Sequence, residues 1–255
     1  MLEIVGNLIV WLGALLLPAA ATAPIAYLAF KQNRFAFAAA WFALTVGIVA
    51  AGYAFSHFAV DLPAFRWRPT LAAWAGGVAA IIAAAAFIAD PERLMRGTAA
   101  ALSAANQKIA RLATWLVLSM AVVQFLVVIL RYVFGVNFIW MQESVTYMHG
   151  AVFLLAGGYA LLTDDHVRVD IFYRDAPAKR RALVDFVGAH LFLFPFCLLL
   201  LWAGAPYIAQ SWSVSEGSTE QSGLQAVFLL KTLIPIFAAL LAGAGFVIAA
   251  RAADI

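Results

Sequence analysis

Charged residues are scarce in this chain of 255 residues. Asp, Glu, Lys and Arg make up 11% of it, whereas hydrophobic residues make up 65%. A soluble globular domain has about 25% charged residues, and the mean hydropathy of +0.95 lies far from that balance. The composition therefore excludes a water-soluble class and predicts an integral membrane protein.

Short alternating strands are also missing, which excludes a transmembrane β-barrel, because barrels are built from such strands. The sequence instead contains long continuous apolar runs, and a helix needs about 20 apolar residues to cross a bilayer. We expect an all-α integral membrane protein with about seven transmembrane helices. The expected spans lie at residues 4–30, 35–60, 70–89, 112–130, 139–162, 183–210 and 224–250.

Cysteine is nearly absent, and so are the short motifs of catalysis. The single cysteine, Cys197, excludes an intramolecular disulfide and is expected to be an inert apolar residue. The sequence has no Cys-x-x-Cys-His, no phosphate-binding Walker loop, no Gly-x-Ser-x-Gly and no His-Glu-x-x-His. We therefore expect no enzyme activity, no cofactor and no metal.

Basic residues are unevenly distributed between the loops, and this asymmetry predicts topology. The loop 211–222 has no Lys or Arg and two Glu, whereas the segment 163–182 is rich in basic residues. Because loops rich in Lys and Arg stay inside the cell, we place the N-terminus outside and the C-terminus, with Arg251, inside. The basic residues of the inner segment are Arg168, Arg174, Lys179, Arg180 and Arg181.

A polar segment at residues 90–111 divides the chain. It begins Asp90-Pro-Glu-Arg93 and is too polar to span. Its apolar residues recur every three or four positions, and its basic residues can meet anionic lipid headgroups, so we expect a surface helix, with an irregular loop as the alternative. The expected domains are a three-helix extension (1–89), this connector (90–111) and a four-helix module (112–255).

Two charged side chains fall inside expected spans. Glu143 lies about one turn into the fifth span, and Lys231 about two turns into the seventh, from the same membrane face. Their depths differ by about 5 Å, so an interhelical ion pair is expected if these helices are neighbours. The alternative is that Lys231 extends to the membrane surface.

Histidines offer two further candidate sites. His149 and His190 lie inside spans and in principle can hold a haem, although neutral imidazoles bonded to neighbouring helices are the favoured interpretation. The inner loop contains His166, Arg168 and Asp170, beside Asp164-Asp165. Adjacent acids diverge on any regular backbone, so we favour docking or mutual pairing at the membrane surface over a metal site.

Several of these segments together resemble the DctQ-type small membrane subunit of tripartite ATP-independent periplasmic (TRAP) transporters, over about residues 112–250. They are Arg131-Tyr-Val-Phe-Gly135, Trp140-x-x-Glu143, His149, Gly157-Gly-Tyr159, Asp164-x-His166-Val-Arg168-Val-Asp170 and Leu230-Lys-Thr-Leu-Ile-Pro235. The chain departs from the family at Gln142, where an acid is common, and in its extra N-terminal helices.

The resemblance implies a bacterial inner-membrane protein with a periplasmic N-terminus, acting as the scaffold of a sodium-coupled transporter of organic anions. The implied partners are a large DctM-type membrane subunit that moves like an elevator, a periplasmic substrate-binding protein and membrane lipids, with no nucleic acid. Alternatives are a haem-bearing anchor of a respiratory complex and a self-sufficient transporter or channel. The polar residues expected at helix or subunit interfaces are Arg131, Trp140, Glu143, His149, His166, Arg168, Asp170 and Lys231.

Overall fold

The computed structural model describes residues 12–32, 89–165 and 173–255, together with the single positions 6, 8 and 9. Every regular element in these ranges is a helix, so the all-α class is confirmed. The elements are η1 (Leu12–Leu16), α2 (Leu17–Gln32), α5 (Pro91–Tyr132), α6 (Ile139–Leu162), α7 (Ala178–Gly188), η2 (Ala189–Leu193), α8 (Phe194–Ser213) and α9 (Val227–Ala253).

Four stretches of the described chain are long and apolar enough to cross a membrane, so the class of multi-pass membrane protein is confirmed as well. They are α5, α6, α9 and the continuous helix Ala178–Ser213, which comprises α7, η2 and α8. The spans expected at 35–60 and 70–89 lie outside the described residues, apart from the last position of the second.

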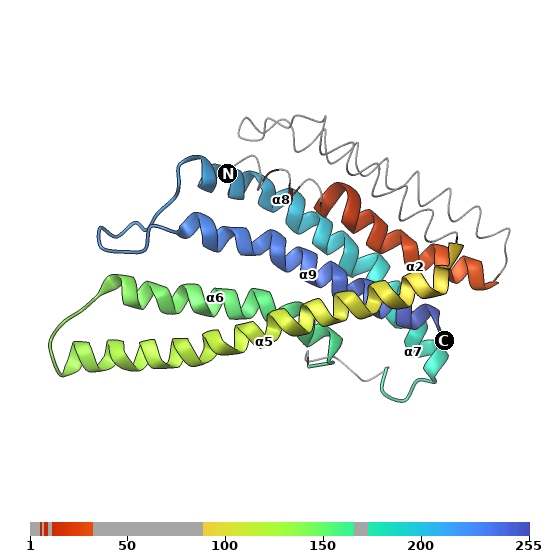
Figure 1. The fold of residues 1–255 in the computed structure, drawn as a ribbon, viewed down its shortest axis with the longest axis horizontal. Coiled ribbons are helices and arrows are strands. Elements are labelled where there is room, and N and C mark those ends of the chain that lie inside the picture. The colour runs from red at the N-terminus through yellow and green to blue at the C-terminus, as the bar shows by residue number, and fades with distance from the viewer. Residues whose placement is uncertain (1–5, 7, 10–11, 33–88, 166–172) are drawn as a thin grey trace.

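Helix α9 lies at the centre of the bundle and contacts α2, α5, α6, α7 and α8 (Figure 1). Its sequence is apolar on all sides, which is typical of a helix surrounded by others. Within its most apolar window 67% of the residues are buried, against 6% in the corresponding windows of α5 and α6. The chain thus packs around α9, leaves most of α5 exposed and leaves most of α6 half-buried.

Helix α5 is 42 residues long, which corresponds to about 63 Å and exceeds the thickness of a bilayer core. Asp90 caps its start by accepting a hydrogen bond from the Arg93 backbone N–H at 3.0 Å, and Pro91 occupies the first turn. The connector expected at 90–111 therefore forms the first half of this one helix and runs straight into the next span. This first half crosses α9, and the second half lies beside α6 (Figure 1).

The α5–α6 turn explains the glycine in the Arg131–Gly135 segment. Gly135 has φ +66°, in the left-handed region that residues with a side chain rarely adopt. Val133 donates its backbone N–H to Ile129 at 2.9 Å, and Val136 donates to Leu130 at 2.9 Å, which together close the end of α5. The chain then reverses direction and enters α6.

Helices α6 and α9 approach closely where α6 carries Gly157 and Gly158. A Cβ atom at Gly158 would lie 2.2 Å from the Asn106 side-chain oxygen of α5 and 2.8 Å from the Leu240 backbone oxygen of α9. Only a residue without a side chain allows three helices to meet here, and small residues serve this purpose widely in membrane proteins. Asn106 is itself 1% exposed and donates its amide to the Leu102 carbonyl at 3.1 Å.

We predict that Gly158→Ala destabilises the bundle by about 1–3 kcal/mol, because the added methyl group must displace the Leu240 backbone or the Asn106 side chain. Thermal unfolding in detergent measures the effect. Gly97→Ala is the matched control, since a Cβ there meets nothing within 4 Å and alanine favours the helix. Equal melting temperatures for the two variants would contradict the proposed role of this crossing.

Candidate functional site

Polar contacts gather at the two ends of the bundle. We call the end that contains the α5–α6 turn and residues 214–226 the loop end, and the end that contains the C-terminus and the start of α5 the terminal end (Figure 1). At both ends, side chains from one element bind the backbone or side chains of another. These contacts determine how the helices are held relative to one another.

Glu143, in the first turns of α6, binds the loop 214–226. One carboxylate oxygen accepts the backbone N–H of Leu224 at 2.6 Å, and the other accepts the Ser218 hydroxyl. A Cβ at Gly223 would lie 2.6 Å from the same carboxylate and 2.3 Å from the Ser218 hydroxyl oxygen, so a glycine is needed here. Charged acceptors form the stronger class of hydrogen bond, so Glu143 anchors the loop to α6.

Lys231, near the start of α9, binds the same loop from the other side. Its ammonium group lies 2.5 Å from the Glu216 carboxylate and 3.8 Å from the centre of the Tyr207 ring of α8. The hydrogen bond from Lys231 is the main reason why the pKa of Glu216 lies below its ordinary value. The lysine side chain is 13% exposed and stabilised by both contacts, so it joins α8, the loop and α9.

The expected ion pair between Glu143 and Lys231 is wrong. Both side chains reach the loop end, as their sequence positions suggested, but the loop 214–226 supplies closer partners to each. Ser218 and the Leu224 N–H satisfy the carboxylate, and Glu216 satisfies the ammonium group. The expectation failed because it considered only partners on other helices and not a folded loop.

The helices on either side of the loop are also joined directly to each other. The Trp212 indole N–H donates to the Thr232 hydroxyl at 2.9 Å, and the Trp212 ring packs edge-on against Phe228 at 4.7 Å. These contacts join the end of α8 to the start of α9. The loop end is therefore a continuous set of contacts through α6, α8 and α9.

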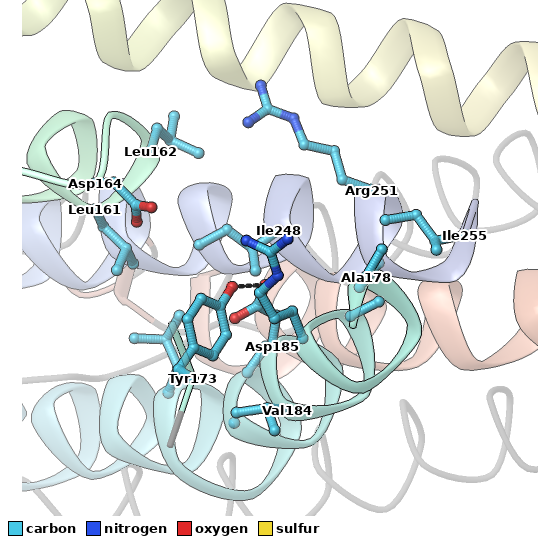
Figure 2. A pocket seen from close by; sticks show the side chains of 16 residues that line it. Leu161, Leu162, Asp164, Tyr173, Ala178, Val184, Asp185, Ile248, Arg251 and Ile255 are labelled. Carbon is cyan, nitrogen blue, oxygen red and sulfur yellow. Dashed lines mark hydrogen bonds between the residues drawn. The ribbon is translucent and has the colours of Figure 1, made fainter. Parts of the chain in front are cut away.

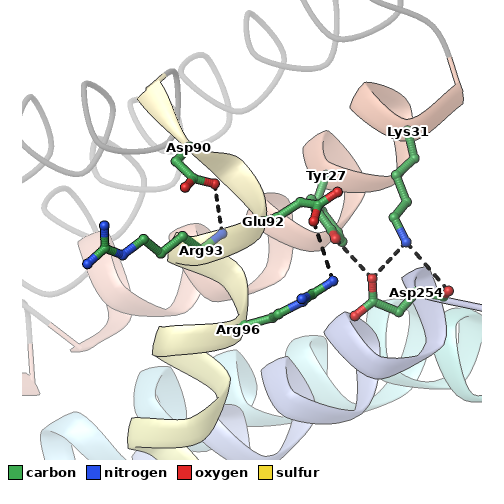
Figure 3. Close-up of polar contacts among 7 residues, drawn as sticks. All are labelled: Tyr27, Lys31, Asp90, Glu92, Arg93, Arg96 and Asp254. Carbon is green, nitrogen blue, oxygen red and sulfur yellow. Dashed lines mark hydrogen bonds and ion pairs between the residues drawn. The ribbon is translucent and has the colours of Figure 1, made fainter.

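At the terminal end, Asp254 joins the last turn of the chain to α2 (Figure 3). The Tyr27 hydroxyl donates to its carboxylate at 2.9 Å, and the Lys31 ammonium group lies 2.7 Å from the same oxygen. Partial burial opposes ionisation of Asp254, but the hydrogen bonds from Lys31 and Tyr27 outweigh it and lower the pKa below 3.8. This contact fastens the N-terminal helix to α9.

The structure separates the two histidines proposed as a haem pair. His190 lies in the π-helical turn η2, with Nδ1 2.6 Å from the Phe186 carbonyl oxygen and Nε2 2.8 Å from the Ala21 carbonyl oxygen of α2. Each nitrogen thus lies against a backbone carbonyl oxygen, one in its own helix and one in α2, and a neutral imidazole donates a hydrogen bond to one of the two. His149 lies on an exposed face of α6 instead.

The remaining sequence candidates are distributed as follows. Arg131 is exposed at the end of α5, and Trp140 is 48% exposed with its ring 6.2 Å from Phe138. His166, Arg168 and Asp170 lie outside the described residues, so their expected role stays a prediction. Within the described ranges, no group of three His, Cys, Asp or Glu side chains is arranged to hold a metal ion.

A pocket of about 630 Å³ opens at the terminal end between α6, α7 and α9 (Figure 2). Leu161, Ile248 and Val184 contribute apolar wall, and the Tyr173 hydroxyl donates to Asp185 at 2.7 Å. Arg251 also lines it, and Figure 2 shows this side chain extending toward α5. The pocket lies at the helix ends, so it belongs to the surface of the bundle and is not a path through it.

The sequence reasoning missed Ser218, Tyr207 and the pair formed by Tyr27 and Asp254. A serine in a polar loop and a tyrosine near a helix end carry no signal of their partners. The neighbouring Gly217 and Gly223 did indicate a folded loop, because two glycines in a short loop are typical of close backbone approach.

Comparison with known proteins gives one match. A family model described as the DctQ component of tripartite ATP-independent periplasmic transporters matches residues 120–254. The matched range contains the last 13 residues of α5 and all of α6 to α9. No curated protein and no solved structure matches the chain.

We predict that Glu143→Ala loosens the loop at residues 218–224, because the Leu224 N–H and the Ser218 hydroxyl lose their acceptor. Hydrogen exchange measured by mass spectrometry should show exchange at least about 5-fold faster in this loop. Glu220→Ala is the control, since the exposed Glu220 contributes only its backbone N–H and carbonyl oxygen, and not its side chain, to the described hydrogen bonds. Unchanged exchange in the Glu143 variant would exclude the anchoring role.

We also predict that acid weakens the contact between α2 and α9. Because the folded-state pKa of Asp254 is lowered, its stabilisation is complete above about pH 3.8 and is lost as the pH falls through the lower folded-state value. Asp254→Asn should lower the free energy of unfolding at pH 7 by less than about 1 kcal/mol. Because Asn cannot ionise, the variant should also lose less stability than the parent protein as the pH falls below about 3.8, which thermal unfolding at a series of pH values measures. Asp175→Asn, at an exposed position, should match the parent protein.

Proposed function

Because this chain belongs to the family of DctQ components of tripartite ATP-independent periplasmic transporters, we propose that it is the non-catalytic scaffold subunit of such a transporter. In this proposal a large DctM-type subunit carries the substrate, and a periplasmic binding protein delivers it. The chain holds the large subunit in place during sodium-coupled uptake of an organic anion. It resides in the bacterial inner membrane.

A scaffold function is supported by the contacts of the polar side chains, which hold parts of this chain together. Glu143, Lys231 and Asp254 each fasten one helix to a loop or to another helix. A carrier needs polar groups that exchange partners as substrate and ions pass, whereas these groups have partners within the bundle. Fixed contacts at both ends suit a subunit that stays still while its partner moves.

The proposed orientation places the loop end in the periplasm and the terminal end in the cytoplasm. It rests on the basic residues of the terminal end, such as Lys179, Arg180 and Arg181 at the start of α7, and on the absence of Lys and Arg from residues 214–226. The loop fixed by Glu143 then lies on the side where a binding protein arrives. The N-terminus is periplasmic and the C-terminus cytoplasmic.

For the N-terminal extension, we assign a supporting role. Helix α2 is fastened to α9 by Tyr27 and Lys31, and the Ala21 carbonyl oxygen faces His190 of η2. These contacts attach α2 to the matched module as a fixed part of it. The extension would therefore enlarge the area of membrane protein that resists movement of the large subunit.

The haem-bearing anchor has less support. Axial ligation of haem iron requires a free imidazole nitrogen, and both nitrogens of His190 lie within hydrogen-bonding distance of backbone carbonyl oxygens. Its proposed partner His149 lies on an exposed face of α6. The purified protein is expected to show no Soret absorption band.

We predict that the full chain, purified from its native membrane in mild detergent, brings with it a larger polytopic membrane subunit identifiable by mass spectrometry. In proteoliposomes, sodium-driven uptake of organic anions should require both membrane subunits and the binding protein. This chain alone should give no uptake above empty vesicles. Uptake by this chain alone, or association only with redox subunits, would contradict the proposed function.

A further inference from the structure

One flank of the α5–α6 hairpin carries polar side chains, of which only Gln142 makes a described side-chain hydrogen bond, to the Asn137 side-chain oxygen at 2.6 Å. We call it the polar flank and define it by Gln124 and Arg131 of α5 and by Gln142, Thr146 and His149 of α6. Gln124, Arg131, Thr146 and His149 are exposed, and Gln142 is half-buried. The flank lies away from α9, on the two helices that the bundle covers least.

The geometry shows that these residues share one side of the hairpin. Gln124 and Arg131 line a shallow pocket of about 340 Å³ together with Gln142, which brings the two helices together at the loop end. From Gln142, positions four and seven residues further along α6 fall on the same helical face. These positions are Thr146 and His149, so the flank continues down α6 toward the membrane interior.

The depth of these side chains makes their exposure costly. Gln124 lies eight residues before the end of α5 at Tyr132, about 12 Å along the helix, and His149 lies ten residues after Ile139, about 15 Å along α6. A hydrocarbon core is about 30 Å thick, so both side chains belong inside it. Lipid tails offer them no hydrogen-bond partner.

The described part of the protein also provides no hydrogen-bond partner for most of these side chains. Among the described contacts, no side-chain hydrogen bond is made by Gln124, Thr146 or His149, and no ion pair by Arg131. By contrast, Ser119 of α5 is also exposed but donates its hydroxyl to the Trp115 carbonyl oxygen at 2.9 Å. Exposed side chains with unused hydrogen-bonding capacity thus lie together on the polar flank.

We propose that a transmembrane helix of the large subunit packs on the polar flank, with hydrogen-bonding side chains at the depth of His149 and a carboxylate opposite Arg131. The inference rests on the proposed function and locates its interface. A second copy of this chain fits less well. A two-fold axis along the membrane normal would place Arg131 at the same depth as Arg131 of the copy, and like charges repel.

Photo-crosslinking from single introduced cysteines tests this placement in the assembled complex. Cys197 is 0% exposed, so it can stay while a benzophenone maleimide is attached to T146C on the flank or to V122C as the control. Val122 is 51% exposed and lies two residues before Gln124, about 200° around α5. We expect adducts with the large subunit from T146C, at least about 5-fold more than from V122C.

Equal yields from the two positions, or adducts of T146C with a second copy of this chain, would overturn the inference. Recovery of the large subunit with the unmodified chain is measured in parallel. Loss of that recovery would contradict the proposed function itself, whereas intact recovery with no adduct from T146C would contradict only the placement. The two failures are therefore distinguishable.

The double variant Gln124→Leu/His149→Leu gives a second, independent test. If the flank is an interface, recovery of the large subunit should fall at least about 5-fold, while the melting temperature of the isolated chain stays equal or rises, because exposed polar groups leave the hydrocarbon. Val122→Leu/Leu126→Val, on the other side of α5, should leave recovery unchanged. A large drop in melting temperature, with unchanged recovery at low temperature, would assign the flank to internal stability and overturn the proposal.

Discussion

The close approach of α6 to α9 at Gly158 is the contact on which the rest of the structure depends. At this point α5, α6 and α9 meet, with the Asn106 amide and the Leu240 backbone where a side chain would otherwise stand. In a membrane no hydrophobic driving force holds helices together, so close packing and internal hydrogen bonds must do so. Contacts at the two helix ends then fix the angle at which the helices leave this crossing.

The division of polar side chains into two groups follows from this arrangement. One group, with Glu143, Lys231 and Asp254, binds helices to one another or to the loop 214–226. The other group lies on the outer side of the α5–α6 hairpin, where α9 cannot reach. A subunit that fixes one group of polar side chains and directs another outward has the properties of a partner in an assembly. Membership of a family of transporter components agrees with this view.

The sequence predicted the class, the four described spans and the resemblance to the family, because long apolar runs and the spacing of polar residues at their ends are local properties. It also placed Glu143 and Lys231 near the same end of the bundle, since depth follows from counting residues along a helix. It did not predict their partners. Ser218, Glu216 and the Leu224 N–H belong to a loop whose fold depends on φ values and close contacts that no periodicity reveals. The continuity of α5 through residues 90–111 was missed for a related reason, because a polar segment in a membrane protein indicates an interface but not where a helix ends.

The pairing of Lys31 with Asp254 has a consequence for how the protein is made. The two residues are separated by 223 positions, almost the whole length of the chain. Ribosomes add about 5–20 residues per second, so α2 enters the membrane at least about 10 s before Asp254 leaves the ribosome. During that interval Lys31 and Tyr27 lack their acceptor. Asp254 therefore completes the contact with the first described helix only after the helices between them have been made, and a chain that stops short of Asp254 cannot form this contact. The ion pair that fastens the end of α2 to α9 is thus formed late in biogenesis.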